Sequence, residues 1–167
     1  VTFNPAHTAL VAMEDRVPEF TLITQNVDGL HLLAGSRNLL EIHGNLWKVR
    51  CTRCDRVRLD RRPDMGTLPE CDDCGGLLRP HVVWFGESLD PGLLERAVGA
   101  VRSCRLMLVI GTSAVVQPAA SLSLEAKAAG ARVAEINLEP TGQSASMDYV
   151  LQGKAGEIVP RLVEGEP

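Results

Sequence analysis

The 167-residue sequence predicts an α/β fold, a doubly wound parallel sheet that carries a small four-cysteine zinc-ribbon module. Two observations predict it. From residue 91 onward, helix and strand patterns alternate, and the strand segments are apolar throughout, which is typical of parallel strands covered on both faces. Before that region, four cysteines stand in two Cys-x-x-Cys pairs. The length fits one domain with a small insert.

The first elements are a helix and a strand. Pro5–Arg16 is expected to be helical, with Asn4 as N-cap and Pro5 in the first turn. Phe20–Thr24 is an apolar run that predicts a short buried strand. Asp28 is expected to cap a short helix that ends at Ala34. The extended segments expected next are Leu39–His43, Leu46–Arg50 and Arg79–Phe85.

The second half alternates between helices and strands. The expected elements are helix Pro91–Arg102, strand Leu106–Ile110, helix Ala119–Ala129, strand Arg132–Ile136 and helix Gly156–Val163. Ligands of such sheets bind beyond the carboxyl ends of the strands. The polar turns at Gln25, Gly111 and Asn137 all follow predicted strands, so we expect a ligand site there.

The cysteine spacing predicts a structural zinc site. Cys51 and Cys54 form one pair, Cys71 and Cys74 the other, and sixteen residues separate them. Four thiolates close a tetrahedral shell around Zn²⁺ and leave no position for water or substrate. A redox-active dithiol pair is the alternative. Cys104 opens an apolar strand and is expected to be a buried, inert thiol.

A run of basic residues crosses the predicted ribbon. It is interpreted either as a contact surface for an acidic partner or, as we favour, as a solvated face with long side chains pointing to water. The basic residues are Lys48, Arg50, Arg53, Arg56, Arg58, Arg61 and Arg62.

Charge and hydropathy exclude some classes of protein. A net charge of −4 and a pI of about 5.6 argue against general nucleic-acid binding, which depends on a basic surface. No apolar run is long enough to cross a bilayer, and no secretion signal opens the chain. Paired Cys-x-x-Cys motifs without such a signal indicate a reducing compartment, so a cytoplasmic location is expected.

Several motifs, in one collinear order, resemble the sirtuin family. They are Thr24-Gln25-Asn26-Val27-Asp28-Gly29-Leu30-His31, Glu41-Ile42-His43-Gly44, the two cysteine pairs, the stretch from Arg79 to Glu87, Gly111-Thr112-Ser113 and Glu135-Ile136-Asn137. The stretch His81-Val82-Val83-Trp84-Phe85-Gly86-Glu87 resembles the bacterial and mitochondrial branch that includes lysine desuccinylases and demalonylases. The resemblance implies a Rossmann-like, NAD-dependent protein-lysine deacylase.

The resemblance also implies the roles of individual residues. His43 matches the family's general base. The implied NAD contacts are Gln25, Asn26 and Asp28 at nicotinamide and its ribose, Gly111, Thr112 and Ser113 at the phosphates and ribose, Asn137, Leu138 and Glu139 at the adenosine ribose, and Ala155 near the adenine. The residues implied to bind the acyl-lysine substrate as an added strand are Val83, Trp84, Phe85, Gly86 and Glu87.

The residue types suit that chemistry. After nicotinamide leaves NAD and the acyl oxygen attacks the ribose carbon, a ribose hydroxyl must lose its proton to attack the resulting imidate. Imidazole is the side chain that titrates closest to neutrality. His43 without the surrounding motifs would be interpreted as structural. His81 precedes a strand and is expected to be structural.

One part of the family pattern is absent from the 167 residues. Sirtuins have an N-terminal segment with a Gly-Ala-Gly phosphate loop and an Arg-bearing cofactor loop, and neither occurs here. A truncated gene, a deliberately shortened protein and a sequence given without its upstream residues each explain this, and we favour the last two. The chain alone is then expected to bind NAD poorly and to self-associate. In the family, the Tyr and Arg that recognise acidic acyl groups lie in that segment. The 167 residues therefore do not decide between acetyl-lysine and succinyl-lysine as the substrate.

The expected organisation is an incomplete NAD-binding catalytic domain, residues 1–47 and 78–167, with the ribbon at residues 48–77. The expected reaction transfers an acetyl, succinyl or malonyl group from protein lysine to NAD, giving nicotinamide, O-acyl-ADP-ribose and free lysine. The alternatives are NAD-dependent mono-ADP-ribosyl transfer and a non-catalytic zinc-ribbon interaction module.

Overall fold

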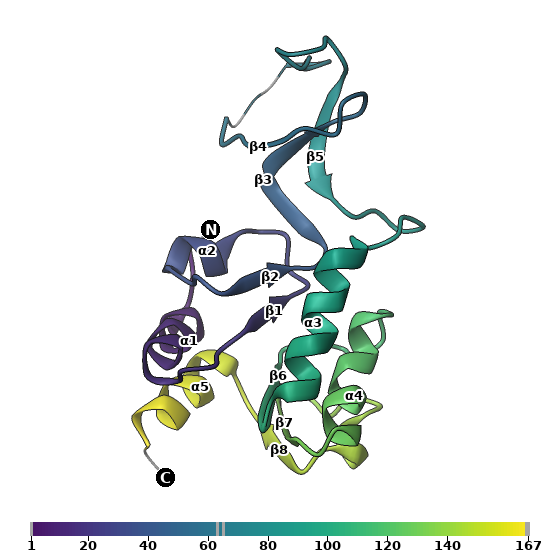
Figure 1. The fold of residues 1–167 in the computed structure, drawn as a ribbon. Coiled ribbons are helices and arrows are strands. Elements are labelled where there is room, and N and C mark those ends of the chain that lie inside the picture. The colour runs from purple at the N-terminus through teal and green to yellow at the C-terminus, as the bar shows by residue number, and fades with distance from the viewer. Residues whose placement is uncertain (1, 63, 65, 166–167) are drawn as a thin grey trace. The chain divides into compact units, whose positions relative to one another are not determined.

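The computed structural model describes residues 2–62, 64 and 66–165, which form two compact units (Figure 1). Unit 1 comprises Val1–Leu22, Leu30–Leu40 and Pro91–Pro167. Unit 2 comprises Ile23–Gly29 and Glu41–Asp90. Unit 2 contains the whole predicted ribbon, residues 48–77, together with the segments that lead into it. Residues 63 and 65 of that ribbon lie outside the described residues.

The first helix of unit 1, α1 (Pro5–Arg16), has the predicted bounds and the predicted N-cap. The Asn4 side chain accepts hydrogen bonds from the backbone N–H groups of Ala6 and His7, and His7 Nδ1 accepts one from the Asn4 N–H. This reciprocal capping satisfies N–H groups that the helix itself leaves without partners. The last helix, α5 (Ala155–Glu164), contributes to the same core as α1, beside it (Figure 1).

The sheet of unit 1 is parallel, as predicted. Its strands are β6 (Leu106–Ile110), β7 (Arg132–Asn137) and β8 (Tyr149–Gln152), in that order. The helices α3 (Pro91–Ser103) and α4 (Leu122–Ala128) precede β6 and β7 in the chain. The predicted helix Ala119–Ala129 is divided, because its first turn is the 3-10 helix η1 (Ala119–Ser121). A second 3-10 helix, η2 (Ser144–Ser146), precedes β8.

The central strand β7 is covered on both faces. Ile136 is fully buried in a cluster with Leu10 of α1 and Val159 of α5. Its neighbour Glu135 points to the opposite face, since side chains alternate along a strand, and it is also buried. The prediction of full burial is wrong for β6, where Leu106 is 57% exposed, because β6 is the edge of the described sheet.

Unit 2 is built on an antiparallel sheet in the order β4-β3-β5. Its strands are β3 (Gly44–Cys51), β4 (Val57–Leu59) and β5 (Leu78–Val82). The strand β5 ends at Val82, and the prediction of an extended segment to Phe85 is wrong at its end, because the backbone turns at Phe85 and Gly86. In the turn, the N–H of Glu87 donates to the carbonyl of Trp84 at 2.9 Å.

The remaining elements join the two units along the chain. The strands β1 (Leu22–Thr24) and β2 (Leu39–Glu41) pair with each other, and α2 (Leu30–Ala34) lies between them in sequence. β1 is shorter than predicted and begins at Leu22.

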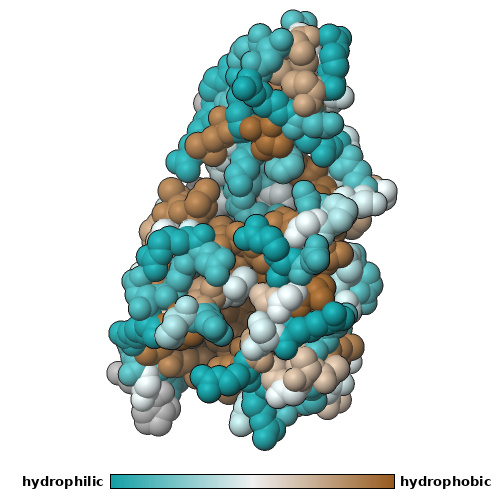
Figure 2. All heavy atoms as spheres, in the orientation of Figure 1, coloured by the Kyte–Doolittle hydropathy of each residue, from teal (hydrophilic) through white to brown (hydrophobic). Residues whose placement is uncertain are grey.

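Apolar side chains also reach the surface. Figure 2 shows hydrophobic spheres in brown among the hydrophilic ones in teal. In unit 2 the exposed apolar residues include Val57, Leu59, Leu68 and Leu77. Among the described residues, no helix combines the length and the apolar character that a membrane crossing needs.

Candidate catalytic and zinc sites

His43 lies in the turn between β2 and β3, held by backbone on two sides. Its Nδ1 is 3.1 Å from the carbonyl oxygen of Gln25. Its own carbonyl accepts a hydrogen bond from the N–H of Val83 at 2.9 Å. A carbonyl oxygen only accepts, so the proton of the neutral ring sits on Nδ1 and the lone pair remains on Nε2. The imidazole is therefore set up to receive a proton at Nε2.

The turn at His43 requires glycine at the next position. Gly44 has φ +85° and opposes Val82 in the β3–β5 ladder. A Cβ on Gly44 would lie 2.0 Å from the carbonyl oxygen of His81, a distance that real Cβ atoms essentially never show. The close approach of β5 to the His43 turn thus depends on the missing side chain.

A buried polar network supports this turn, and sequence reasoning missed it. The fully buried Asn45 donates from Nδ2 to Glu41 and accepts the backbone N–H of Trp47 at 2.7 Å. Lys48 donates to the second oxygen of Glu41 at 2.7 Å. The only signal in the sequence is the position of Asn45 directly after the His-Gly pair.

The predicted nicotinamide residues Gln25, Asn26 and Asp28 lie in one loop of unit 2 beside the start of β3. The N–H of Leu46 donates to the Val27 carbonyl at 2.8 Å, and the Trp47 indole donates to the Asp28 carbonyl at 2.8 Å. Asn26 is exposed, whereas Gln25 and Asp28 are half-buried. The structure therefore brings this loop and His43 together within unit 2.

The predicted adenosine and phosphate residues converge at one end of the sheet in unit 1. Because β6 and β7 are parallel, their carboxyl ends meet, and Asn137 Nδ2 donates to the Thr112 carbonyl at 2.8 Å. Gly111, Ser113, Leu138 and Glu139 are exposed at these strand ends.

β8 brings the start of α5 to the same edge. Gln152 pairs with Asn137, the N–H of Gly153 donates to the Asn137 carbonyl at 2.8 Å, and α5 begins at Ala155.

Gln143 supports the Gly111–Ser113 loop and was not predicted. Its amide nitrogen donates to the carbonyls of Ala114 at 3.2 Å and Ala120 at 2.9 Å, and its amide oxygen accepts from Ser123 at 2.7 Å. Ala114 has φ +55°, a left-handed conformation that a non-glycine residue adopts only under constraint. Nothing in the sequence connects Gln143 with Ala114, 29 positions earlier.

The predicted substrate segment, Val83–Glu87, follows β5 in unit 2. Trp84 is 55% exposed and Phe85 is 100% exposed. Gly86 has φ +90° and closes the turn. The side chain of Glu87 points back to Arg79, which donates to both carboxylate oxygens at 2.6 and 2.7 Å.

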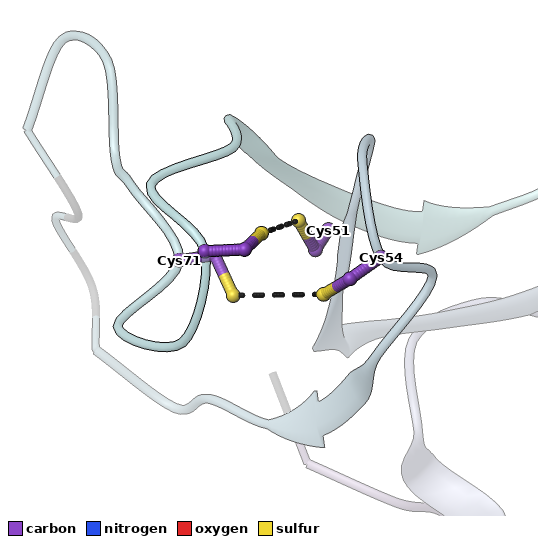
Figure 3. Close-up of side chains that lie close together, drawn as sticks. Cys51, Cys54 and Cys71 are labelled. Carbon is purple, nitrogen blue, oxygen red and sulfur yellow. Dashed lines mark hydrogen bonds between the residues drawn. The ribbon is translucent and has the colours of Figure 1, made fainter.

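The four predicted zinc ligands form one cluster (Figure 3). Cys51 Sγ and Cys74 Sγ are 3.4 Å apart, Cys54 Sγ and Cys71 Sγ are 3.9 Å apart, and all four sulfurs lie within 4.8 Å of one another. Four ligands at Zn–S distances near 2.3 Å place tetrahedral sulfurs about 3.8 Å apart. The donor set and the spacing therefore fit a closed, structural zinc site.

The electrostatics of the cluster also favour a cation. Hydrogen bonds from the backbone N–H groups of Cys54 and Arg53 lower the pKa of Cys51 to about 6. A hydrogen bond from the Gly76 N–H lowers the pKa of Cys74, but the contact with Cys51, burial and the other thiols together raise it to about 12. The four thiols cannot all ionise side by side without a positive ion to neutralise them.

Acidic residues pair with much of the basic run on the ribbon. Arg56 pairs with Asp73 and Arg58 with Asp72, across the two cysteine turns. Arg62 pairs with Asp60, and Lys48 with Glu41. Arg53 donates to the carbonyl of Cys74 at 2.7 Å. These contacts favour the interpretation of the basic run as a solvated face whose charges are paired within the chain. They argue against an open binding site for an acidic partner.

Comparisons with known proteins agree with the fold. A sequence profile of the Sir2 family matches residues 1–118. The NAD-dependent protein deacylase 2 of Pyrobaculum aerophilum is 48% identical over 161 residues, which cover 96% of this chain and 65% of that protein.

Two solved structures are similar over nearly the whole chain. A crystal structure of a Sir2 homolog–NAD complex has a TM-score of 0.94 at 48% identity, over 98% of this chain and 64% of that one. A complex of Sir2 with a p53 peptide and NAD⁺ has a TM-score of 0.89 at 34% identity, over 99% of this chain and 70% of that one.

The chain belongs to the Sir2 family. It spans about two-thirds of the length of the relatives it matches.

Proposed function

We propose that the complete protein removes acyl groups from lysine side chains of proteins or peptides and consumes NAD in doing so. Its relative in Pyrobaculum aerophilum carries the name of an NAD-dependent deacylase. A similar structure contains both a peptide and NAD⁺. The products are nicotinamide, O-acyl-ADP-ribose and free lysine.

The observation that carries this proposal is the hydrogen bond between His43 and the Gln25 carbonyl. It fixes the tautomer in which Nε2 is the base. Deprotonating a ribose hydroxyl requires a neutral imidazole with one ring nitrogen free to accept. The loop that presents the carbonyl also holds Gln25, Asn26 and Asp28, whose amide and carboxylate groups suit hydrogen bonds to a carboxamide and to hydroxyls.

NAD, when bound, supplies an ADP-ribosyl group whose bond to nicotinamide breaks as the acyl oxygen bonds to the ribose carbon. The residues of unit 1 bind the rest of the dinucleotide in this proposal. Asn137 and Ser113 offer hydrogen-bonding side chains to ribose hydroxyls, and Gly111 leaves space for close approach. The residues Thr112, Leu138, Glu139 and Ala155 complete this edge of the sheet.

The zinc ion has no step in the proposed reaction. Cys51, Cys54, Cys71 and Cys74 would use all four coordination positions, so the ion would stabilise the ribbon only. Zinc-binding Cys-x-x-Cys pairs are typical of reducing compartments, and we therefore propose a cytoplasmic location. The Val83–Glu87 segment, with Phe85 fully exposed, is the proposed binding surface for the acyl-lysine strand.

The test uses the complete protein, NAD and peptides that carry acetyl-, succinyl- or malonyl-lysine. Mass spectrometry should find free lysine and acyl-ADP-ribose in equal amounts, with one nicotinamide released for each. His43→Ala should lower kcat by at least about 100-fold, the usual contribution of a general base. ADP-ribose attached to protein would instead support the transferase alternative, and turnover without NAD would contradict both.

The matched control is His7→Gln. This variant also removes an imidazole, but Gln at the third helical position makes the same reciprocal capping bond. Turnover should therefore stay at the wild-type level. Equal activity in His43→Ala and the wild type would remove His43 from the mechanism.

A further inference from the structure

Arg79 and Glu87 form a compact clasp around the segment to which we assign substrate binding. Arg79 donates from two guanidinium nitrogens to the two Glu87 oxygens at 2.6 and 2.7 Å. This two-point geometry is stronger and more directional than a single ion contact. The Arg79 side chain is only 18% exposed, so solvent screens this pair less than a surface pair.

The same two side chains also hold the backbone between them. Arg79 Nη2 donates to the Val82 carbonyl at 2.8 Å. The N–H of Trp84 donates to Glu87 Oε2 at 3.0 Å, and the N–H of Glu87 donates to the Trp84 carbonyl at 2.9 Å. The guanidinium carbon of Arg79 lies 4.5 Å from the centroid of the Trp84 ring, within the range of a cation–π contact.

The contacts of Arg79 and Glu87 occupy some backbone groups of the Val83–Glu87 segment and leave others available to a partner strand. Trp84 uses both its N–H and its carbonyl inside the turn, and Val83 donates its N–H to His43. Phe85 and Gly86, at the tip, are exposed and form no hydrogen bond within the part of the chain that the structure describes. Phe85 and Gly86 are therefore accessible at the tip of the turn, whereas the side chain of Glu87 is held by Arg79.

We infer that Arg79 and Glu87 are positioning residues that shape the Val83–Glu87 turn for an incoming acyl-lysine strand, and that the side chain of Glu87 is held by Arg79 and does not contact the substrate. The turn is joined to His43 by the Val83 hydrogen bond, which involves neither Arg79 nor Glu87. This inference rests on the proposed function, since it assigns its substrate-binding surface.

The test measures the kinetics of Glu87→Gln in the complete protein, with an acyl-lysine peptide and NAD varied in turn. Glutamine keeps the size of the side chain but loses the charge and one acceptor. The KM for the peptide should rise about tenfold, which corresponds to the loss of one charge-assisted contact. The kcat and the KM for NAD should change less than about twofold, because the clasp touches neither the reacting atoms nor the dinucleotide.

Glu125→Gln is the matched control. Glu125 also pairs with an arginine, Arg102, at 2.8 Å, and its side chain is 35% exposed against 36% for Glu87. It lies on α4 in unit 1, outside the proposed sites. All kinetic constants of this variant should match the wild type.

Amide hydrogen exchange gives a second readout that does not depend on turnover. In Glu87→Gln the N–H groups of Trp84 and Glu87 should exchange faster, whereas the strands β3 and β5 keep their protection. Arg79→Lys keeps the charge without the two-point geometry and should give an intermediate KM.

A wild-type protein that fails to deacylate any peptide overturns the proposed function and this inference with it. An active wild type beside a Glu87→Gln variant with unchanged peptide KM and unchanged Trp84 exchange overturns the inference alone. A fall in kcat at constant KM also contradicts it, since that result would place Glu87 at the reacting atoms.

Discussion

Gln25 contributes to the candidate site through its backbone carbonyl as well as through the side chain that the motif singled out. The carbonyl fixes the His43 tautomer, and any residue at position 25 would present that group. The glycine at position 44 has the opposite property, because no other residue fits there. Sequence motifs therefore mix residues required for their chemistry with residues required for backbone geometry.

Gly44→Ala tests the geometric requirement. The added Cβ would meet the His81 carbonyl oxygen at 2.0 Å, and the alanine would hold φ +85°. β3 and β5 must separate at the His43 turn, so the free energy of unfolding should fall by well over about 1 kcal/mol, with loss of turnover. Urea unfolding and the kinetic assay measure the two effects.

Gly130→Ala is the control for Gly44→Ala. Gly130 has φ +97°, but a Cβ there would meet nothing within 4 Å. This variant should show only the conformational cost of about 1 kcal/mol and full activity. Equal stability losses in the two variants would contradict the steric account.

At the residue scale, the sequence predicted side chains whose chemistry is visible in their type and spacing. The four cysteines form the expected cluster, and the Asn137 side chain meets the Thr112 backbone at the strand ends. Asn45, Gln143 and Arg79 were missed as supporting residues. Their roles depend on burial and on partners that only folding brings near, and no local spacing encodes those.

At the scale of elements, segments with capping signals or a continuous apolar run were predicted best. α1 has the predicted bounds, and β6 does as well, because capping signals and a continuous apolar run define them. β4 and β8 were missed. Both have mostly exposed residues, including Val57 and Tyr149, so no buried pattern distinguishes them from loops.

Asp148 connects β7 and β8, and its contribution to stability should depend on pH. The Val133 N–H donates to it, and Lys127 and Arg132 pair with it; these contacts lower its pKa below 3.8. A carboxylate with a lowered pKa stabilises the fold above its ordinary pKa, and the effect is lost as pH falls through the lowered value. The difference in unfolding free energy between wild type and Asp148→Asn should be constant above about pH 5 and shrink below about pH 4.

Urea titrations at several pH values measure this difference, and the comparison with the variant cancels effects of acid on other groups. Asp15→Asn serves as control, since Asp15 makes an exposed ion pair with Arg37. The unfolding free energy of Asp15→Asn should differ little from that of the wild type at every pH. A difference for Asp148→Asn that grows as the pH falls would contradict the assignment.

Zinc removal should loosen the ribbon and leave the sheet of unit 1 ordered. The sulfurs of Cys51 and Cys71 belong to the small core of the ribbon with Val49 and Leu78, so unpaired thiolates would repel one another there. Atomic emission should find one zinc ion per chain. After chelation, amide exchange should accelerate in β3, β4 and β5 but not in β6, β7 and β8.

Two cysteine variants make the zinc measurement specific. Cys74→Ser should lower the zinc content severalfold, whereas Cys104→Ser should keep it, because the Cys104 thiol donates to the Val101 carbonyl away from the cluster. Full zinc content in Cys74→Ser, or unchanged exchange after chelation, would show that the four thiols do not form the site.

At the scale of the whole molecule, the residues assigned to NAD divide between two compact units. Gln25, Asn26, Asp28 and His43 belong to unit 2, and those at the ends of β6 and β7 belong to unit 1. Collinear motifs predicted both groups, although the pattern of secondary structure alone would have defined only the sheet. The chain spans 65% of its Pyrobaculum relative, so activity is a property to be measured on the complete protein.

The most direct measurement follows the acyl group itself. The complete protein is incubated with NAD and a peptide whose acetyl-lysine carries ¹³C in the acetyl group, and the products are separated by mass spectrometry. The account predicts that the label leaves the peptide only when NAD is present and first appears on ADP-ribose, together with one nicotinamide for each free lysine. Label released directly as acetate without consumption of NAD, or ADP-ribose bound to protein while the acetyl group stays on lysine, would contradict it.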